Sequence, residues 1–458
     1  MEKEKIDLIL ERQKIFFASG RTNDVKFRLD ILKKLRELII QHDQELRDAL
    51  WKDFHKPECE VLSSEIQFVI KEINLAIRKL RQWARPQKVR TPLVHFIAKS
   101  YVWPQPYGQI LILSPWNFPF QLAMVPAIGA LAAGDCVVLK PSQQAPATGA
   151  VLEKITGHLP DEIIAIIRGD HALSEHLLNY KFDYIFFTGS SNVGRYVAGK
   201  AAANLIPFSL ELGGKSPCVV MADARLDYAV KRIAWGKFYN AGQTCVCPDY
   251  LLLDKKIKDR FLDLLTREIK SFYGENPEQS KDFPHVISPD KTIRLESLMK
   301  KGQIVTGGKT DPEKCYVAPT VIKDIRPDDP IMQEEIFGPV LPVMDFENPE
   351  EVYGIIEQNP QPLAAYIFTR NKRVAREFLT KVKCGSAAVN DTVVQFASPY
   401  LPFGGVGRSG IGRYHGRKSF ETFSNMRAVM VKSNRIDLFL RYPPYSNLKN
   451  KAFRWFMR

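Results

Sequence analysis

Two cysteines spaced one residue apart, Cys245 and Cys247, are the side chains best suited to chemistry in this sequence. A thiolate is a nucleophile and a metal ligand, whereas two buried thiols can also act as small apolar side chains. No second cysteine or histidine pair with zinc spacing lies nearby, so we expect no metal site. The preceding turn, residues 240–244, is polar and contains a glycine, which favours an exposed thiol. Local chemistry alone supports a nucleophilic and a structural Cys245 equally well.

A glycine-bearing segment at residues 189–194 has the features of a phosphate-binding loop. It follows the apolar run at residues 184–187 and opens a stretch of helical composition. Backbone amides and the dipole at a helix N-terminus attract phosphate groups, although an ordinary strand-to-helix turn has the same pattern. The candidate cofactor-binding residues of this loop are Gly189, Ser190, Ser191, Asn192, Val193 and Gly194.

A second glycine motif, Gly405–Gly410, has the residue types of the GxGxxG dinucleotide fingerprint but not its surroundings in the sequence. The fingerprint requires a preceding strand, a following helix and an acidic residue about twenty positions later. Here Pro402 and Phe403 precede the motif, and more glycines follow it. We therefore expect a glycine-rich loop without the cofactor role of the fingerprint.

Short apolar runs alternate with stretches of helical composition from Gly108 onward. The expected strands are residues 110–113, 136–139, 163–167 and 184–187, and the expected helices are residues 121–133, 147–158, 171–179 and 192–203. A second series follows Gly213, with strands at 218–221 and 251–253 and helices at 226–238 and 260–271. Strands that alternate with helices at this spacing predict an α/β fold with a doubly wound parallel sheet, typical of dinucleotide-binding domains.

Helices are expected in the first eighty or so residues. Apolar side chains recur there at helical spacing in two stripes, at residues 31–39 and 66–80, and core packing explains both. The helical region should end near Trp83, because Pro86 drives the residue before it out of the α conformation.

The composition restricts the class of protein and its surroundings. Seven cysteines scattered over 458 residues do not form a disulfide framework, and the N-terminus does not resemble a secretory signal, so we expect a cytoplasmic protein. The net charge is +14, but basic and acidic residues are interspersed, which predicts a solvated surface and no nucleic-acid partner. Residues 100–134 are uncharged yet contain five prolines, which favours a buried core over a membrane span.

Six segments in a fixed order resemble those of the aldehyde dehydrogenase superfamily. The most specific is FYNAGQTCVCP at residues 238–248, which is similar to the segment of the catalytic cysteine. The other five are SPWNFP at 114–119, KPS at 140–142, ELGGKSP at 211–217, EIFGPV at 335–340 and PFGGVG at 402–407. The C-terminal part, with YHG at 414–416 and SFETFS at 419–424, most resembles the class 3 branch of this superfamily.

The resemblance implies a mechanism and three catalytic residues. Cys245 would attack the aldehyde to form a thiohemiacetal and then a thioester, with Asn117 and the backbone N–H of Cys245 as the oxyanion hole. Glu211 would activate the water that hydrolyses the thioester. A coenzyme-A-acylating aldehyde dehydrogenase and a cysteine esterase that uses Cys245 and Glu211 are the alternatives.

The resemblance also implies NAD or NADP as the cofactor and a small-molecule aldehyde as the substrate. Many relatives have glutamate directly after the KPS segment, and Gln143 in its place puts a strict preference for NAD in doubt. Beyond the loop at 189–194, the implied cofactor-binding residues are Ser114, Pro115, Trp116, Lys140, Gln143, Leu212, Glu335 and Phe337.

The expected domains follow from the same likeness. We expect a coenzyme-binding domain at 1–84 and 108–211, a second α/β domain at 212–388 that carries catalysis, and a small bridging or oligomerisation element at 85–107 and 389–440 of a homodimer. The tail at 441–458 contains aromatic and basic residues but no apolar anchor or prenylation box. We expect no stable membrane anchor, and a tail that folds back over its own subunit or its dimer partner.

Overall fold

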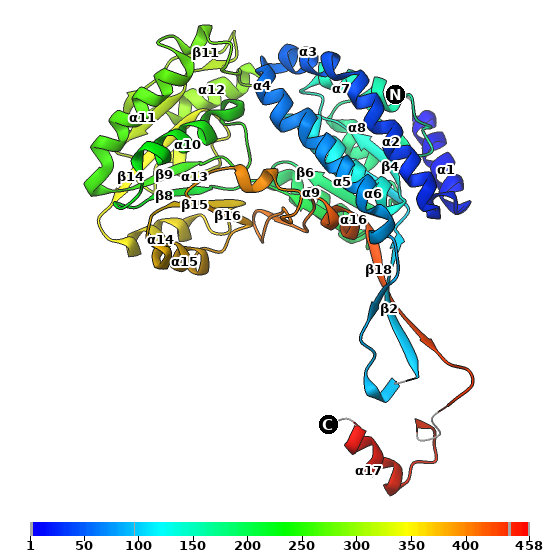
Figure 1. Cartoon of the computed structure of the whole chain (residues 1–458). Helices are drawn as coiled ribbons and strands as arrows, with labels where there is room; N and C mark the ends of the chain where they lie inside the picture. The colour runs from blue at the N-terminus through cyan, green and yellow to red at the C-terminus, as the bar shows by residue number, and fades with distance from the viewer. Residues whose placement is uncertain (1–2, 96, 438–440, 457–458) are drawn as a thin grey trace.

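The computed structural model describes residues 3–95, 97–437 and 441–456 and contains two α/β bodies that lie side by side. A narrow three-stranded arm projects from one of them, as Figure 1 shows. Each body is built around a mostly parallel sheet, of six strands in one and seven in the other. The expected α/β fold with a doubly wound parallel sheet is therefore confirmed.

The six-stranded sheet has the order β17-β7-β6-β3-β4-β5, and all neighbours except β17 and β7 run parallel. Chain order reverses direction between β3 and β6, which is where doubly wound sheets bind their ligands. The strands match the four expected from the sequence, with small differences at their ends. They are β3 (Gln109–Leu113), β4 (Cys136–Lys140), β5 (Ile164–Ile166), β6 (Tyr184–Thr188), β7 (Phe208–Glu211) and β17 (Gly410–Ile411).

Helices cover both faces of this sheet. Successive side chains of β3 point to opposite faces, so its apolar residues are buried by helices on each side. Ile110 and Ile112 belong to the large core formed with α2, α5 and α6, whereas Leu111 and Leu113 pack with α1, α8 and α9. The helix α5 ends at Trp83, as expected before Pro86. These helices are α1 (Lys3–Ala18), α2 (Val25–Gln41), α3 (Asp43–Phe54), α4 (Glu58–Val61), α5 (Gln67–Trp83), α6 (Gln121–Ala133), α7 (Pro146–Thr156), α8 (His171–Leu177) and α9 (Ser191–Ala203).

The seven-stranded sheet has the order β10-β13-β14-β9-β8-β15-β16, and only β10 is antiparallel to its neighbour. Leu251 and Leu253 of β9 pack with α10 and α11, and Leu252 faces the core that includes α12, α14 and α15. The strands are β8 (Pro217–Val220), β9 (Tyr250–Asp254), β10 (Gln303–Thr306), β13 (Thr320–Lys323), β14 (Val340–Phe346), β15 (Ala364–Phe368) and β16 (Ser386–Val389). The helices are α10 (Leu226–Phe238), α11 (Lys258–Tyr273), α12 (Pro289–Leu298), α13 (Pro330–Gln333), α14 (Pro349–Gln358) and α15 (Lys372–Lys381).

Residues from near the C-terminus return to the first body before the arm begins. The strand β17 adds to the edge of the six-stranded sheet, and α16 (Arg417–Thr422) packs on α6. Gly129 of α6 allows this contact, since a Cβ there would lie 2.6 Å from Ser419. The domain boundaries given above stay a prediction.

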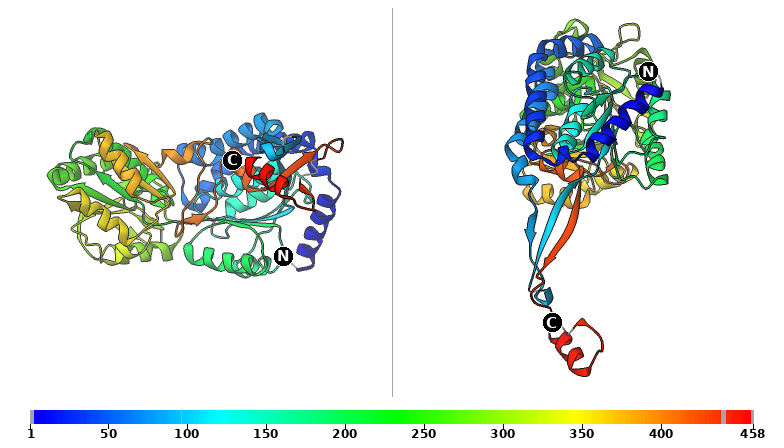
Figure 2. Two further views of the ribbon diagram at one scale, coloured as in Figure 1. Left: turned by 90° about the horizontal axis from the view of Figure 1, so that it is seen from below. Right: turned by 90° about the vertical axis from the view of Figure 1, so that its right-hand side faces the viewer.

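The arm consists of β1 (Gln87–Val89), β2 (Ala98–Pro106) and β18 (Ser424–Lys432), with β2 between the other two. The strand β2 contains the first part of the uncharged stretch, and residues 101–107 are not buried, whereas β3 and α6 from the same stretch are fully buried. Figure 2 shows the arm pointing away from both bodies.

The tail helix α17 (Asn447–Phe456) lies at the far end of the arm and not on the body of its own subunit (Figures 1 and 2). Tyr445, Leu448 and Trp455 are 66%, 76% and 75% exposed. The expectation that the tail folds back over its own subunit is therefore wrong, because the arm carries it out of reach. Its docking on a partner subunit stays a prediction. Within the part of the chain that the structure describes, no helix has the length and apolar character needed to cross a membrane.

Candidate active site

A cavity of about 690 Å³ lies where residues from the two bodies meet. From the first body it is lined by the turn after β3, the loop after β6 and the end of β7; from the second it is lined by the cysteine loop and the segment before β14. Most of the residues expected in the site lie here: Pro115, Trp116, Asn117, Gly189, Ser190, Ser191, Asn192, Glu211, Leu212, Cys245, Glu335 and Phe337.

The cysteine loop begins where α10 ends at Phe238. Asn240 and Ala241 have φ values of 54° and 50°, in the left-handed region that side chains other than glycine adopt at a cost. Gly242 continues the turn with φ of 69°, and a Cβ there would lie 2.2 Å from the carbonyl oxygen of Gly338. Two side chains hold this turn in place, Asn240 and Gln243. The turn ends at Cys245, whose thiol faces the cavity.

Asn117 lies beside this loop and is 3% exposed. Its side-chain Nδ2 donates a hydrogen bond to the backbone carbonyl oxygen of Gln243 at 3.0 Å. The backbone carbonyl oxygen of Asn117 accepts a hydrogen bond from Asn240 Nδ2 at 2.9 Å. A side-chain amide carries two N–H donors, so the contact with Gln243 uses only one of them. The structure therefore places a fixed amide donor next to the thiol in the same cavity.

Glu211 is the last residue of β7 and is 3% exposed. Neither of its carboxylate oxygens has a hydrogen-bond partner among the described residues. Burial raises the pKa of Glu211 well above its usual range, and Arg413 opposes this shift. A buried carboxylate with free oxygens beside a thiol is the arrangement expected for a group that exchanges protons during a reaction.

Burial also raises the pKa of the Cys245 thiol, and the nearby carboxylates of Glu335 and Glu211 add to the shift. The thiol form is thus favoured at neutral pH in this structure. Burial likewise raises the pKa of Glu335 to about 8. The pKa values of three groups around one cavity are therefore raised, because each group would carry a negative charge in its deprotonated form.

Glu335 and Phe337 are held close to the cavity by backbone contacts. Arg294 of α12 donates to the carbonyl oxygens of Glu335 and Ile336 at 2.6 and 2.8 Å. Gly213 passes so near Glu335 that a Cβ there would lie 2.0 Å from a carboxylate oxygen. The rings of Phe337 and Trp116 meet edge to face, with their centroids 5.4 Å apart.

The loop at 189–194 has the strand–loop–helix arrangement expected from the sequence. It follows β6 and opens α9, and the Ser190 hydroxyl accepts a hydrogen bond from the N–H of Val193. Thr188, which also lines the cavity, has a buried hydroxyl without a partner among the described residues. Free donors at a helix N-terminus suit a phosphate, so the residues present fit a dinucleotide. The motif at 405–410 instead leads into β17 and not into a helix.

Five of the expected cofactor residues do not line this cavity. Gln143 lines a second cavity of about 320 Å³ next to β4, together with Ser142 and Arg168. Ser114 and Lys140 are buried neighbours at the ends of β3 and β4, joined by a 3.2 Å hydrogen bond from the Ser114 N–H to the Lys140 carbonyl oxygen. Burial lowers the pKa of Lys140. Val193 and Gly194 also lie outside the linings, and Gly194 lets Leu212 pack against α9.

Several lining residues were not expected from the sequence. Tyr414, fully buried, reaches the main cavity from the loop before α16, and Arg168 reaches the second cavity from beyond β5. Lys291 and Arg294 come from α12. No local pattern distinguishes Arg168, Lys291 or Arg294, and the YHG segment at 414–416 indicated only the class 3 branch and no role for Tyr414 in the site. Only the meeting of distant segments brings these residues to the site.

The sequence model of the aldehyde dehydrogenase family matches residues 1–429. The chain belongs to this family. The expected enzyme class, an NAD(P)-dependent aldehyde dehydrogenase with NAD or NADP as cofactor, is thereby confirmed.

Relatives and solved structures of the family resemble the chain over nearly its full length. The 4,4′-diaponeurosporen-aldehyde dehydrogenase of Staphylococcus aureus is 40% identical and covers 94% of this chain and 95% of its own. Aldehyde dehydrogenase family 3 member H1 of Arabidopsis thaliana is 42% identical, with 98% and 94% covered. A substrate-bound structure of Staphylococcus aureus AldH superposes with a TM-score of 0.97 at 39% identity, with 99% of each chain covered. The expected likeness to the class 3 branch is confirmed.

The raised pKa of Cys245 predicts how fast this thiol reacts with a neutral alkylating reagent. Only the thiolate reacts, so in the protein without dinucleotide the rate at Cys245 should rise about tenfold per pH unit up to at least pH ~9. Iodoacetamide labelling followed by peptide mapping measures it, with the exposed Cys59 as internal reference. A rate that levels off below pH ~7 would contradict the raised pKa.

Proposed function

We propose that the chain oxidises aldehydes to carboxylic acids through a covalent thioester on Cys245. The observation that carries this proposal is the shared cavity of Cys245, Asn117 and Glu211, in which the Glu211 carboxylate is buried without a hydrogen-bond partner among the described residues. A nucleophile, an amide donor and a proton acceptor are the groups that acyl chemistry needs at one carbon atom.

The first step is attack of Cys245 Sγ on the aldehyde carbonyl carbon. The S–C bond forms, the thiol proton passes to solvent water, and the electron pair of the C=O π bond moves to the carbonyl oxygen, which becomes an oxyanion. The Asn117 amide, held by Gln243, and the backbone N–H of Cys245 donate to this oxygen. One such donor lowers the activation barrier by about 3 kcal/mol in other enzymes. A bound nicotinamide supplies the hydride acceptor that the oxidation to the thioester requires.

The second step is hydrolysis of the thioester, for which Glu211 takes a proton from water. The water oxygen bonds to the carbonyl carbon, the C–S bond breaks, and the Cys245 thiol is regenerated with release of the acid. The raised pKa of Glu211 makes its carboxylate a stronger base than an exposed one. A coenzyme-A-acylating enzyme has no need of this group, so its presence favours hydrolysis.

The dinucleotide would lie across the first body, from the main cavity to the second cavity, which Gln143 lines. We propose that Trp116, Glu335 and Phe337 hold the nicotinamide end, that residues 189–194 hold the phosphates, and that Lys140 and Gln143 hold the adenosine ribose. The helix N-terminus at Ser190 and the buried amine of Lys140 support this assignment. Ser114, Pro115 and Leu212 would shape the same channel.

The substrate is proposed here as a class of aldehydes and not as one compound. The resemblance implies medium-chain aliphatic and aromatic aldehydes, and the Staphylococcus aureus relative is named for a carotenoid aldehyde. A panel should therefore include short, long apolar and aromatic aldehydes. The homodimer and the cytoplasmic location stay predictions.

The substitution Cys245→Ser tests the proposal directly. Serine has a far higher pKa than cysteine, so this variant should lose dehydrogenase activity over the whole aldehyde panel and still bind NAD or NADP. Nicotinamide absorbance and dinucleotide binding are the two measurements, and Cys247→Ser is the matched control with normal turnover. A Cys245→Ser enzyme with near-normal turnover would show that Cys245 is structural.

The substitution Glu211→Gln separates the two steps. An amide cannot take a proton from water, so thioester hydrolysis should slow by on the order of a hundredfold or more. Rapid mixing of enzyme, aldehyde and dinucleotide should show a burst of reduced cofactor followed by a slow steady state. Equal loss of the burst and the steady state would instead assign Glu211 to thiol activation.

The second cavity predicts how the enzyme discriminates between its cofactors. Gln143 is neutral where a carboxylate would repel a 2′-phosphate, and the Arg168 guanidinium lines the same cavity. NADP should therefore be used at a rate comparable to NAD, and Gln143→Glu should shift the ratio toward NAD. The ratio of the two kcat/KM values measures it. A wild-type preference for NAD above roughly a hundredfold, about 2.7 kcal/mol, would reject this role of Gln143.

A further inference from the structure

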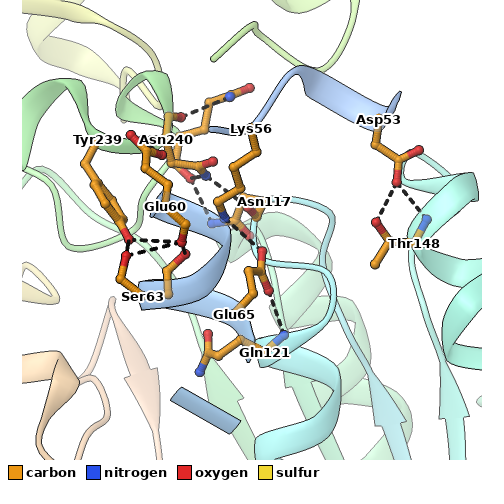
Figure 3. Close-up of polar contacts among 12 residues, drawn as sticks. Asp53, Lys56, Glu60, Ser63, Glu65, Asn117, Gln121, Thr148, Tyr239 and Asn240 are labelled. Atoms are coloured by element: carbon orange, nitrogen blue, oxygen red, sulfur yellow. Dashed lines mark hydrogen bonds and ion pairs between the residues drawn. The ribbon is translucent and has the colours of Figure 1, made fainter. Parts of the chain in front are cut away.

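The segment Lys56–Ile66 lies directly behind the cavity and contacts both loops that carry the proposed reacting groups (Figure 3). It contains the short helix α4 and a π-helical turn at Leu62–Ile66. Irregular turns of this kind are often found next to functional sites. None of the residues in the segment lines the main cavity, so any effect on the reaction must act through its neighbours.

Glu60 holds the cysteine loop where its left-handed turn begins. Its Oε2 accepts a hydrogen bond from the backbone N–H of Asn240 at 2.9 Å, where the left-handed turn begins. Next to it, the hydroxyls of Tyr239 and Ser63 are 2.9 Å apart. Burial raises the pKa of Glu60 to about 7, and both forms of the carboxyl group keep an oxygen that accepts this bond.

A buried ion pair in the same segment holds the turn of Asn117. Lys56 Nζ lies 2.8 Å from Glu65 Oε1, both side chains are fully buried, and the Lys56 ammonium sits 4.0 Å from the centre of the Phe118 ring. Glu65 Oε2 accepts a hydrogen bond from the N–H of Gln121 at 2.8 Å, at the start of α6. Phe118 and Gln121, which both follow Asn117, are thus fixed to one ion pair.

Asn240 joins the two loops to each other. Its Nδ2 donates to the carbonyl oxygens of Asn117 at 2.9 Å and Gln243 at 3.1 Å. The same Gln243 oxygen receives the Asn117 side-chain amide. Figure 3 shows Asn117 and Asn240 side by side. A shift of Asn240 would therefore change the position of the Asn117 amide relative to Cys245.

We propose that Glu60 is a positioning residue of the reaction, which fixes the spacing between the Asn117 amide and the Cys245 thiol by holding the backbone of Asn240. This inference rests on the proposed function, in which these two groups bind the oxyanion and form the thioester. Donors that bind a developing oxyanion must be fixed before the reaction, and a small misplacement of a reacting group reduces the rate strongly.

The test compares Glu60→Ala with Glu60→Gln. The alanine variant leaves the Asn240 N–H without its acceptor, so kcat should fall by roughly ten- to hundredfold with KM and dinucleotide Kd nearly unchanged. The glutamine variant keeps an acceptor oxygen and should retain kcat within about threefold of wild type. Hydrogen–deuterium exchange of residues 239–245 should become faster in Glu60→Ala and stay slow in Glu60→Gln.

The matched control is Asp53→Ala, in the same part of the chain and also drawn in Figure 3. Asp53 accepts hydrogen bonds from the backbone N–H groups of Ala147 and Thr148 at 3.0 and 2.8 Å. These partners belong to α7 and not to the cysteine loop. Asp53→Ala should lower the melting temperature and leave kcat at saturating dinucleotide unchanged. If Glu60→Ala does not fold, Asn240→Asp removes the Nδ2 donors and should show the same loss of kcat.

Four outcomes decide the proposal. Loss of kcat in Glu60→Ala with rescue in Glu60→Gln supports it. Wild-type kcat in Glu60→Ala, or an equal loss in Asp53→Ala, overturns it. An inactive wild-type enzyme would reject the proposed function alone. Hydrogen–deuterium exchange at residues 239–245 would then still decide whether Glu60 holds this loop. Unchanged exchange in Glu60→Ala would overturn that role.

Discussion

The left-handed turn at residues 240–242 is the constraint on which the rest of the site depends. Its conformation is unfavourable for Asn240 and Ala241, so it persists only because surrounding groups hold it. These groups come from both bodies: Glu60 and Asn117 from one, Gln243 and Gly338 from the other. The turn is therefore formed correctly only when the two bodies are packed against each other.

Low solvent access gives the cavity its chemical character. The pKa values of Cys245, Glu211 and Glu335 are all raised there, because burial penalises a negative charge; the carboxylates of Glu335 and Glu211 raise the pKa of Cys245 further. A carboxyl group such as Glu335, whose pKa is raised to about 8, can exchange protons near neutral pH, which exposed carboxylates cannot. The same burial explains why the charges behind the cavity are paired: Lys56 and Glu65 compensate each other's charge.

Much of the fold could be predicted because each element expresses its own pattern locally. The apolar run of β4, the uncharged helix α6 and the end of α5 before Pro86 all appear in the structure within a few residues of their expected bounds. The irregular parts could not be predicted in this way. The π-helical turn at Leu62–Ile66 and the path of the tail away from its own subunit depend on contacts between distant segments.

The sequence by itself determined the family, the α/β architecture and the loops that meet in the main cavity, since residue types at fixed spacing carry that information. Only the tertiary structure decided which further residues join them: Tyr414, Arg168 and Arg294 reach the two cavities from elements far away in the chain. It also decided the raised pKa values of Cys245 and Glu211 and the contact of Glu60 with Asn240. Burial and distance are properties of the packed molecule, and no local stretch of sequence contains them.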